Sequence, residues 1–320
     1  MRHLLTHLVS KRYTWFALSL LVILPGLLSL ALFGLKQGID FTGGTVWTMQ
    51  FSHDVDTEQI SNVFEQNGFG EAAVQSVGNE GAHAYLIRTK EITEGSAEKH
   101  RIADQITQQI GPFTELEFAS VGGAISSEIR KRALQAIVLA SVGILAYIAY
   151  AFRNTQNSLL YGSCAIVAML HDVLVVLGLF SIFGVLFGIE IDALFVTALL
   201  TVIGFSVHDT IVVFDRIREN LAQHSDPTFE EVVDYSLAQT VVRSLNTSLT
   251  VALTLLALFL FGGASTRTFV LTLLIGVISG TFSSIFNASQ LLVAWENGEI
   301  QRFFGRIFRR TPDANAAPSG

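Results

Sequence analysis

Ionisable side chains inside long apolar stretches are the residues of this sequence best suited to chemistry. His171 with Asp172, His208 with Asp209, and Arg243 lie in such stretches or at their start. An ionisable group within a membrane is costly unless it is paired or hydrated, so each marks a functional site. A carboxylate that can pair with arginine or take up a proton, beside imidazoles that can hold water, is what a proton relay needs. These five residues are therefore candidates for a proton relay.

Two other arrangements would use the same residue types. A static ion pair between an acid and an arginine can fix how buried helices pack. Acids and histidines can also bind a metal or another cation. Residue spacing alone leaves these two alternatives open beside the relay.

Counting residues along the expected helices places Asp209 and Arg243 at one level. Asp209 lies 17 residues into its helix, and Arg243 lies 18 residues before the end of its own. At 1.5 Å per residue, both lie roughly 25 Å from the same membrane surface. Asn287, 19 residues into the last helix, returns to this level, whereas Asp172 lies nearer the middle of the membrane. We therefore expect the acid and the guanidinium to share a layer if their helices are neighbours.

A polar stripe follows Arg243 along the fifth apolar helix. Its members are Arg243, Asn246, Thr247, Thr250 and Thr254, at offsets 0, 3, 4, 7 and 11. These offsets place them on one face at 3.6 residues per turn. Because the membrane interior offers no water to such groups, the stripe should face protein or water and not lipid.

The composition indicates a polytopic membrane protein. Hydrophobic residues make up 50% of the chain and charged residues only 15%, and the mean hydropathy is +0.50. That balance excludes an ordinary soluble globule. The net charge of -7 and the lack of a basic stripe with interleaved aromatics argue against nucleic acid as a partner.

Six apolar stretches are long enough to cross a membrane. They are residues 13–35, 133–152, 158–186, 193–214, 241–261 and 268–295. A helix needs about 20 residues to span the hydrocarbon core. The first stretch follows a basic start and imitates a signal peptide, but at 23 residues it is long enough to be an uncleaved membrane helix.

Lys and Arg gather in the flanks that share a side with the N-terminus, whereas the two short loops on the other side hold only Arg267. By the positive-inside rule, segment 1–12, loop 215–240 and tail 296–320 are cytoplasmic. The start of the tail mixes Arg with Phe and Ile, which fits either an anchor to anionic membrane lipids or plain positive-inside charge. Its end, rich in Pro, Ala and Ser, is expected to be disordered.

The polar insert 36–132 is expected outside the membrane as a small α+β domain. Strand-like and helical patterns alternate at 46–51, 57–66, 73–77, 84–87, 97–110 and 113–121. The order β-α-β-β-α-β is that of the ferredoxin-like fold. His53, His83 and His100 lack metal-ligand spacing and are interpreted as surface residues.

Several motifs that would indicate other functions are absent from the sequence. It has no phosphate-binding G-x-x-x-x-G-K-[ST] loop and no nucleophile elbow, so we expect no enzyme. Cys164 is the only cysteine, which excludes disulfides within the chain and is interpreted as a small buried hydrophobe. Gly276, Gly280 and Ser284 form a small-xxx-small face that favours close helix packing.

Two motifs resemble the SecD/SecF family of protein-export membrane proteins, which is related to the resistance-nodulation-division exporters. The stretch GIDFTGGT, 38–45, is similar to the family signature after the first helix. The stretch VIGFSVHDTIVVFDRIREN, 202–220, is similar to its fourth-helix signature. The resemblance extends over about residues 13–300, and the length and small insert fit the smaller of the paired subunits.

The resemblance implies a subunit that uses the proton-motive force to promote late steps of pre-protein export across the bacterial inner membrane. Implied partners are SecD, the SecYEG channel with SecA indirectly, and the exported unfolded pre-proteins; no cofactor or metal is implied. Asp209 and Arg243 occupy the positions of the family's transmembrane acid and arginine, and His171-Asp172 resembles its third-helix motif. His208 stands where many relatives have Asn, which adds a second titratable group.

The GIDFTGGT turn joins the first helix to the insert. Adjacent glycines permit backbone angles and close approaches that other residues cannot make. We interpret Asp40, Gly43 and Gly44 as a hinge through which helix movements tilt the outer domain, with a rigid packing corner as the alternative. For the whole protein, two alternatives stay open: half of a proton-driven small-molecule or lipid exporter, or a purely structural stabiliser of the translocase.

Overall fold

The computed structural model describes residues 8–77, 81–153, 157–223 and 227–302 of the 320-residue chain. The chain divides into two compact units. The helical unit comprises Met1–Leu35, Val138–Ile189 and Thr197–Gly320, and the α/β unit comprises Lys36–Ile137 with Glu190–Val196. The expected disordered end of the tail lies outside the described residues.

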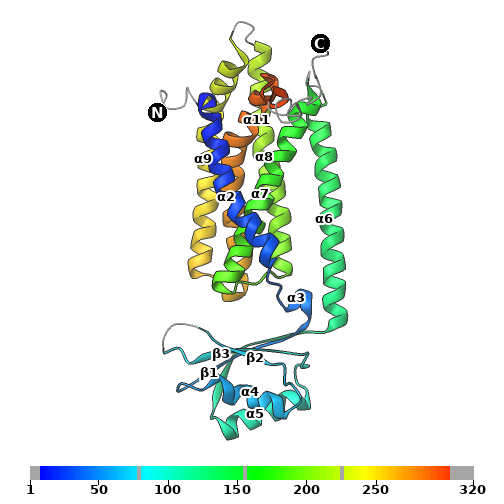
Figure 1. Cartoon of the computed structure of the whole chain (residues 1–320), viewed down its shortest axis with the longest axis vertical. Helices are drawn as coiled ribbons and strands as arrows, with labels where there is room; N and C mark the ends of the chain where they lie inside the picture. The colour runs from blue at the N-terminus through cyan, green and yellow to red at the C-terminus, as the bar shows by residue number, and fades with distance from the viewer. Residues whose placement is uncertain (1–7, 78–80, 154–156, 224–226, 303–320) are drawn as a thin grey trace, which may run out of the picture. The chain divides into compact units, whose positions relative to one another are not determined.

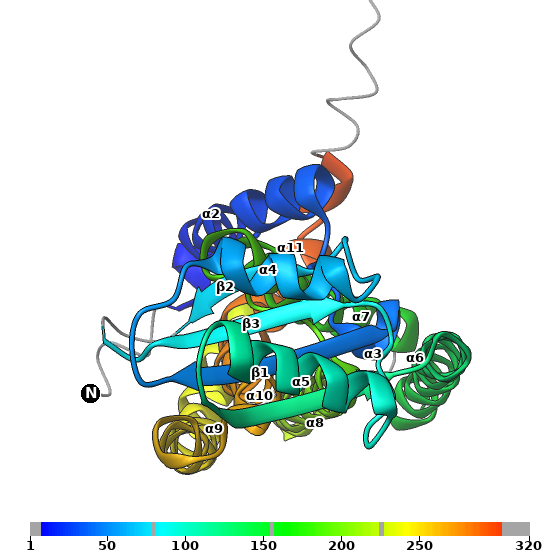
Figure 2. The same cartoon turned by 90° about the horizontal axis from the view of Figure 1, so that it is seen from below.

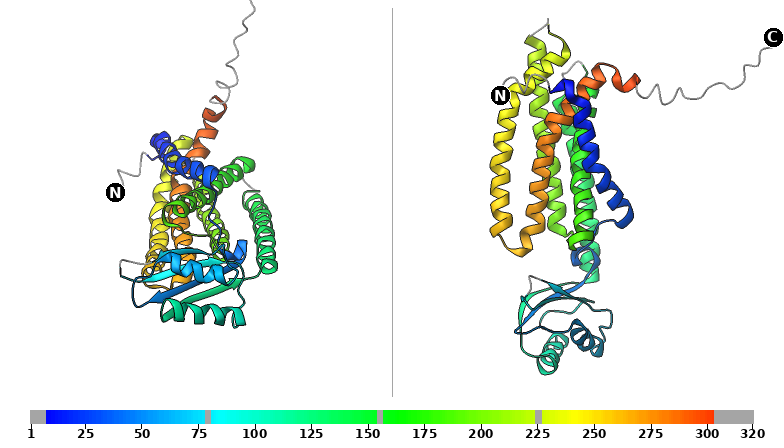
Figure 3. Two further views of the ribbon diagram at one scale, coloured as in Figure 1. Left: turned by 60° about the horizontal axis from the view of Figure 1, so that its bottom comes forward. Right: turned by 60° about the vertical axis from the view of Figure 1, so that its left-hand side comes forward.

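Within the described ranges, six helices are long and apolar enough to cross a membrane, as the sequence predicted (Figure 1). The first five are α2 (Arg12–Phe33), α6 (Gly123–Ala151), α7 (Ser158–Phe187), α8 (Ala193–Gln223) and α9 (Phe229–Phe261). The sixth consists of α10 (Arg267–Ser283), a π-helical segment (Ser284–Ala288) and α11 (Ser289–Glu296). Short 3-10 turns, Val9–Lys11 and Ala264–Thr266, precede α2 and α10, and α9 runs alongside α10 (Figure 3).

Three helix ends extend beyond the expected bounds. Helix α6 begins at Gly123 and not at 133, and α8 continues to Gln223 and not only to 214. Helix α9 begins behind a capping box, in which Thr228 and Glu231 satisfy each other's backbone N–H groups. The described parts of segment 215–240 are therefore mostly helical, and the capping-box spacing of Thr228 and Glu231 already predicts a helix that starts there. Hydropathy marks the part of a helix that crosses lipid, whereas backbone hydrogen bonds continue for several polar turns beyond it.

Helix α2 packs against α7 through two glycines. A Cβ atom on Gly26 would lie 2.8 Å from Cα of Gly178, so the two backbones touch at this crossing. Pro25 precedes Gly26 inside α2. One turn further, the hydroxyls of Ser29 and Ser181 lie 2.8 Å apart, and Ser181 also donates to the carbonyl of Gly34. Small residues here allow the close approach that stabilises helix pairs in lipid.

Replacing Gly26 with Val should destabilise the helical unit. The added side chain meets backbone and cannot be accommodated by a rotamer change, and such overpacking costs about 1–3 kcal/mol. The matched control is Gly143→Val, because a Cβ on Gly143 meets nothing within 4 Å. Thermal unfolding of the purified protein in detergent, followed by circular dichroism, measures the difference. Equal midpoints for the two variants would contradict the tight crossing.

An ion-pair cluster joins three segments at the end of the helical unit where α2 begins. Arg12 donates to both carboxylate oxygens of Glu299 and lies 3.3 Å from Glu230 at the start of α9. The hydroxyl of Tyr13 donates to Glu299 at 2.7 Å, and Asp234 accepts from the backbone N–H of Val9 at 3.0 Å. The cluster ties the start of α2 to α9 and to the segment after α11.

The hydrogen bond from Arg12 lowers the pKa of Glu299 below its usual 4.5. A carboxyl whose folded pKa is depressed stabilises the fold above the unfolded pKa and loses that contribution as the pH falls through the folded pKa. Wild type should therefore be more heat-stable than Glu299→Gln at neutral pH, and the difference should vanish as the pH falls below about 4.5. The control is Glu128→Gln, whose partner Arg132 is 76% exposed. A difference that persists in acid would contradict the ion pair.

The α/β unit has the expected ferredoxin-like fold. Its elements are β1 (Gly44–Phe51), α4 (Thr57–Gln66), β2 (Ala73–Val77), β3 (Ala84–Thr89), α5 (Ala97–Gln109) and β4 (Phe113–Val121), with the short α3 (Ile39–Thr42) before β1. The strands form one antiparallel sheet in the order β2-β3-β1-β4, and α4 and α5 lie across one face of it (Figure 2).

The core of this unit lies between the sheet and its two helices. Alternate residues of β1, Trp47, Met49 and Phe51, point to the helices and are buried. They meet apolar residues such as Ile60 of α4 and Ile102 of α5. Apolar residues recur every second position along β1 and about every 3.6 positions along the helices, so the apolar faces of the sheet and the helices meet in one core.

Candidate functional site

Asp172 lies in the middle of α7 and is fully buried. Ser206 of α8 donates to its Oδ2 at 2.5 Å, and Ser283 of α10 donates to the same oxygen at 2.6 Å. Ser279 donates to Oδ1 at 2.6 Å, and Nδ1 of the neighbouring His171 lies 3.0 Å from that oxygen. Hydroxyl donors thus reach both oxygens of this buried carboxylate. Three helices therefore meet on the Asp172 carboxylate.

Asp209 lies one turn beyond Ser206 on α8 and has two hydroxyl partners. Ser244 of α9 donates to its Oδ1 at 3.0 Å, and Ser284 of the π-helical segment donates to Oδ2 at 2.9 Å. A carboxylate can accept about four hydrogen bonds, so Asp209 keeps acceptor capacity that Asp172 has used. The two acids sit in different hydrogen-bonding environments.

Consecutive serines connect the two acids. Ser283 ends α10 and contacts Asp172, whereas Ser284 begins the π-helical segment and contacts Asp209. A π-helical turn carries one extra residue and rotates the side chains that follow it, and such turns are frequent at functional sites. Ser206 also belongs to both groups, because it bonds Asp172 from the helix that carries Asp209. We call these acids and their five serine partners (Ser206, Ser244, Ser279, Ser283 and Ser284) the acid cluster.

The predicted small-residue face of the sixth span packs against α8. A Cβ on Gly280 would lie 3.3 Å from Cα of Ser206 and 3.6 Å from Oδ2 of Asp172. A Cβ on Gly276 would overlap the side chain of Val202. Ser284, the third member of the face, contacts Asp209. The small residues thus bring α10 close enough to α8 for its hydroxyls to reach both acids.

His171 separates Asp172 from two apolar cavities. Its Nε2 is buried and has no hydrogen-bond partner among the described residues. The cavities, of about 360 and 380 Å³, lie beside α2, and His171 and Ser19 line both. Ser19 of α2 donates to Oδ1 of Asn287 at 2.8 Å. Asn287, which the sequence analysis placed at the level of Asp209, therefore bonds to α2 and not to Asp209.

Arg243 and the polar stripe lie on the exposed face of α9. Arg243 forms no salt bridge with any residue that the structure describes, so its pairing with a transmembrane acid, which the sequence left open, stays a prediction. The next residue, Ser244, points inward to Asp209, which shows that α8 and α9 do meet at the level found by counting. His208 is exposed as well. The exposed residues are Arg243, Asn246, Thr247, Thr250, Thr254 and His208.

The turn after α2 is tightly packed. Gly43 and Gly44 have φ of +76° and +107°, which favour glycine. A Cβ on Gly44 would lie 2.6 Å from the carbonyl oxygen of Thr89, and one on Gly43 would lie 3.3 Å from Oγ of Ser126. Asp40 accepts a hydrogen bond from the backbone N–H of Ala193 at 2.9 Å. These contacts fit a packing corner better than a free hinge.

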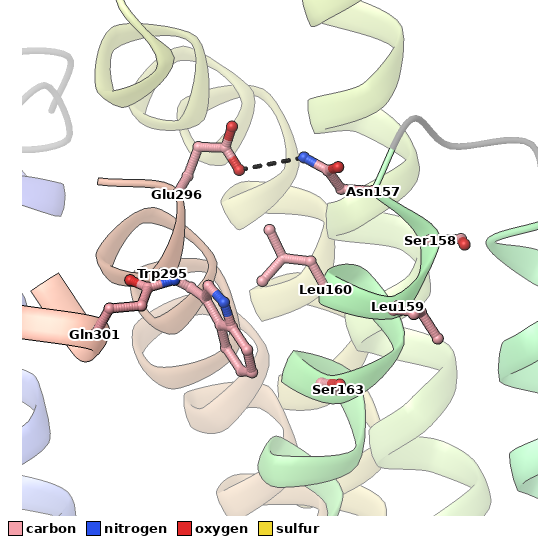
Figure 4. A pocket seen from close by; sticks show the side chains of 8 residues that line it. All are labelled: Asn157, Ser158, Leu159, Leu160, Ser163, Trp295, Glu296 and Gln301. Atoms are coloured by element: carbon pink, nitrogen blue, oxygen red, sulfur yellow. Dashed lines mark hydrogen bonds between the residues drawn. The ribbon is translucent and has the colours of Figure 1, made fainter. Parts of the chain in front are cut away.

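A further cavity, of about 490 Å³, lies between the start of α7 and the end of α11 (Figure 4). Asn157 donates to Glu296 at 3.4 Å across it, and the ring of Trp295 points toward Leu160 and Ser163. None of the predicted relay residues lines it. In the described parts of the chain, no group of three or more His, Cys, Asp or Glu residues could hold a metal ion.

The sequence analysis missed four serines of the acid cluster and singled out the fifth, Ser284, only for helix packing. Each lies in an apolar helix, where a serine is common and carries little information by itself. Their spacing offered a weak signal, because Ser279 and Ser283 are four residues apart and so share one face of a helix. What makes them functional candidates is the acid that they contact on another helix.

The described part of the chain has six membrane-crossing helices, with two acids between them, and a ferredoxin-like unit after the first helix. These features define a class of multi-pass membrane protein. A family model described as "Protein export membrane protein SecD/SecF, C-terminal" matches residues 102–298, and one described as "SecD/SecF GG Motif" matches residues 28–55. The chain therefore belongs to the SecD/SecF family of protein-export membrane proteins.

Individual relatives agree with this assignment. Protein translocase subunit SecF of Thermobaculum terrenum is 55% identical over 317 residues, which cover 97% of this chain and 99% of the relative. The SecF of Anaerolinea thermophila is 43% identical over 304 residues, covering 94% and 97%. The crystal structure of SecDF from Thermus thermophilus matches with a TM-score of 0.75 at 32% identity, covering 90% of this chain and 38% of that chain. The protein is thus an accessory subunit of the Sec translocase. In the SecDF relatives, SecD and SecF are fused in one chain, which supports the association of this protein with SecD.

The charge of Asp172 can be tested through its serine partners. A hydrogen bond to a charged group contributes about 1.5–3 kcal/mol, against about 0.5–1.5 kcal/mol for a neutral one. Ser279→Ala should therefore cost more unfolding free energy than Ser248→Ala, because Ser248 bonds the neutral hydroxyl of Thr281. In an Asp172→Asn background the cost of Ser279→Ala should fall to the neutral range. Equal costs in both backgrounds would mean that Asp172 is uncharged in the resting protein.

Proposed function

We propose that this protein works with SecD to couple the proton-motive force to late steps of pre-protein export across the bacterial cytoplasmic membrane. The observation that supports the proposal is the acid cluster, in which two carboxylates within the membrane-crossing helices are linked through consecutive serines. Ionisable groups at such depth are typical of proton pathways. Asp209, Asp172, His171, His208 and Arg243 form the proposed relay.

Proton exchange at Asp209 would change how α8 bonds to its neighbours. When ionised, both carboxylate oxygens accept from hydroxyls. When protonated, one oxygen becomes a donor, so Ser244 or Ser284 must turn its hydroxyl and accept, or lose the bond. These two bonds tie α8 to α9 and to the π-helical segment. A proton on Asp209 would therefore favour a different arrangement of the three helices.

The exposed polar stripe of α9 is the proposed contact with SecD. Arg243 and Asn246 cannot face lipid without a large cost, so protein or water must cover this face of α9. This chain covers 38% of the SecDF chain of Thermus thermophilus. In the proposal, SecD supplies the helices that cover this face. Arg243 would then act across the interface with SecD. The exposed His208 lies beside Asp209 on α8 and would connect the same interface to the acid cluster.

The remaining elements of the proposal follow from the charge pattern and the family. Both termini are cytoplasmic by the positive-inside rule, and the α/β unit lies outside, where it meets exported, unfolded pre-proteins. The SecYEG channel, with SecA indirectly, and membrane lipids complete the set of proposed partners.

Replacing Asp209 with Asn should abolish the gradient-dependent part of export. The amide preserves size and hydrogen bonding but cannot exchange a proton. Pre-protein translocation is measured in inverted vesicles with SecD and the channel, with and without a proton gradient, at matched complex levels. The control is Asp215→Asn, which makes the same change on the same helix at a residue paired with Arg218 and 61% exposed.

Three outcomes would decide against the proposal. Unchanged gradient dependence in Asp209→Asn would make Asp209 structural. Loss of complex assembly in Asp209→Asn, with no loss of coupling per complex, would favour the purely structural role. Loss of gradient dependence in Asp215→Asn as well would indicate a general effect of charge on the helix.

A further inference from the structure

The segment between α2 and β1 is bound to the segment between α7 and α8. The N–H of Gly38 donates to the carbonyl of Ile191 at 2.9 Å, and the N–H of Ile191 donates to the carbonyl of Lys36 at 2.8 Å. Gln37 and Ile191 form a parallel β-bridge. All of these residues belong to the α/β unit. A short stretch of the α7–α8 connection is therefore paired to the start of the α/β unit as a strand would be.

Side chains reinforce this backbone pairing. Glu190 lies 2.5 Å from Arg88 of β3 and 3.5 Å from Lys36. A Cβ on Gly38 would lie 3.1 Å from the carbonyl oxygen of Ile191, so any other residue would push the two paired segments slightly apart. The connection is thus held to both the sheet and the segment after α2.

Asp40 caps the first turn of α8 from outside that helix. Its Oδ2 accepts from the N–H of Ala193, the first residue of α8, at 2.9 Å. Asp192, directly before the helix, accepts from the N–H of Phe195 at 2.7 Å. The first N–H groups of a helix have no partner within the helix, and these two carboxylates accept hydrogen bonds from two of them. Their negative charges also interact favourably with the positive end of the helix dipole. Burial, and to a lesser degree the charge of Asp40, raise the pKa of Asp192.

Helix α8 is continuous from this capped start to the acid cluster. It runs unbroken over Ala193–Gln223 and carries both Ser206 and Asp209. Beyond Asp40, the chain enters β1 through Gly43 and Gly44, whose close contacts leave little freedom for bending. A helix start bound to a rigid corner transmits displacement, whereas a flexible hinge absorbs it.

We propose that Asp40 is a positioning residue that fastens the start of α8 to the GIDFTGGT corner, so that displacement of α8 on proton exchange at Asp209 moves the α/β unit. This inference rests on the proposed function. It assigns to Asp40 the mechanical step between proton exchange and pre-protein movement. The two backbone bonds at Ile191 and the Asp40 cap together are called the α8 clamp.

The test compares Asp40→Ala, Asp40→Asn and Asp56→Ala in inverted vesicles that contain SecD and the channel. Asp56 is a matched control, because its side chain accepts from Glu58 at the start of α4 and so caps a helix of the same unit that does not lead to Asp209. Asp40→Ala and Asp56→Ala each lose one capping bond and should lose similar stability. Gradient-dependent export should disappear in Asp40→Ala alone, and Asp40→Asn should retain it because its amide oxygen still accepts.

A cross-link separates mechanical coupling from a merely structural role. Gln37→Cys with Ile191→Cys would close the clamp covalently, in a Cys164→Ala background that removes the native thiol. Oxidation should restore gradient-dependent export to Asp40→Ala, and a reducing agent should abolish it again. Translocation without a gradient should stay at the wild-type level throughout.

Four outcomes would overturn the inference. Full gradient dependence in Asp40→Ala would overturn the clamp and leave the proposed function intact. Equal losses in Asp40→Ala and Asp56→Ala, or no rescue on oxidation, would reduce Asp40 to a stabilising cap. If wild type itself shows no gradient dependence, the proposed function fails and the clamp fails with it.

Discussion

A carboxylate buried among apolar helices needs hydrogen-bond donors for both of its oxygens, and the Asp172 carboxylate imposes this requirement on the helical unit. The donors come from Ser206, Ser279 and Ser283, with His171 beside them. Because a serine side chain is short, the helices that supply it must approach closely. Gly280 allows that approach, since any side chain there would crowd Ser206 and the carboxylate itself. The positions of α7, α8 and α10 therefore depend on one buried acid.

The second acid shows why the cluster is suited to change. Asp209 has two hydroxyl donors and lies next to the exposed His208, whereas Asp172 has its acceptors filled. Ser283 at the end of α10 contacts one acid and Ser284 at the start of the π-helical segment contacts the other, so a movement of the sixth span affects both. Hydroxyls can donate or accept after a simple rotation. A network of serines between acids is thus able to follow a proton without breaking the packing of the helices.

One helix of the acid cluster also belongs in part to the α/β unit. Helix α8 begins in the α/β unit and continues into the helical unit, where it carries Ser206 and Asp209. Its first turn is capped by Asp40, and Gly43 and Gly44 fix the path from Asp40 into β1. The contacts of the GIDFTGGT motif fit a packing corner better than a hinge. Its glycines allow the close approach of backbones.

The sequence by itself determined the architecture. Hydropathy and residue period are local properties, so the six spans and the β-α-β-β-α-β order could be predicted, several strands and helices to within a residue or two. Asp172 and Asp209 could be singled out because charge is costly in lipid. Helix ends beyond the apolar windows, as in α6 and α8, could not, because backbone hydrogen bonding continues where hydropathy falls.

Only the tertiary structure decided which groups satisfy the acids. The expected partner of Asp209 was Arg243, yet the helix presents Ser244 to the acid and turns Arg243 outward. A shift of one residue rotates a helical side chain by about 100°, which counting along a helix cannot resolve. The bond from Ala193 to Asp40 joins residues 153 apart in sequence. Such partners depend on how helices pack, because packing brings together groups that no local pattern relates.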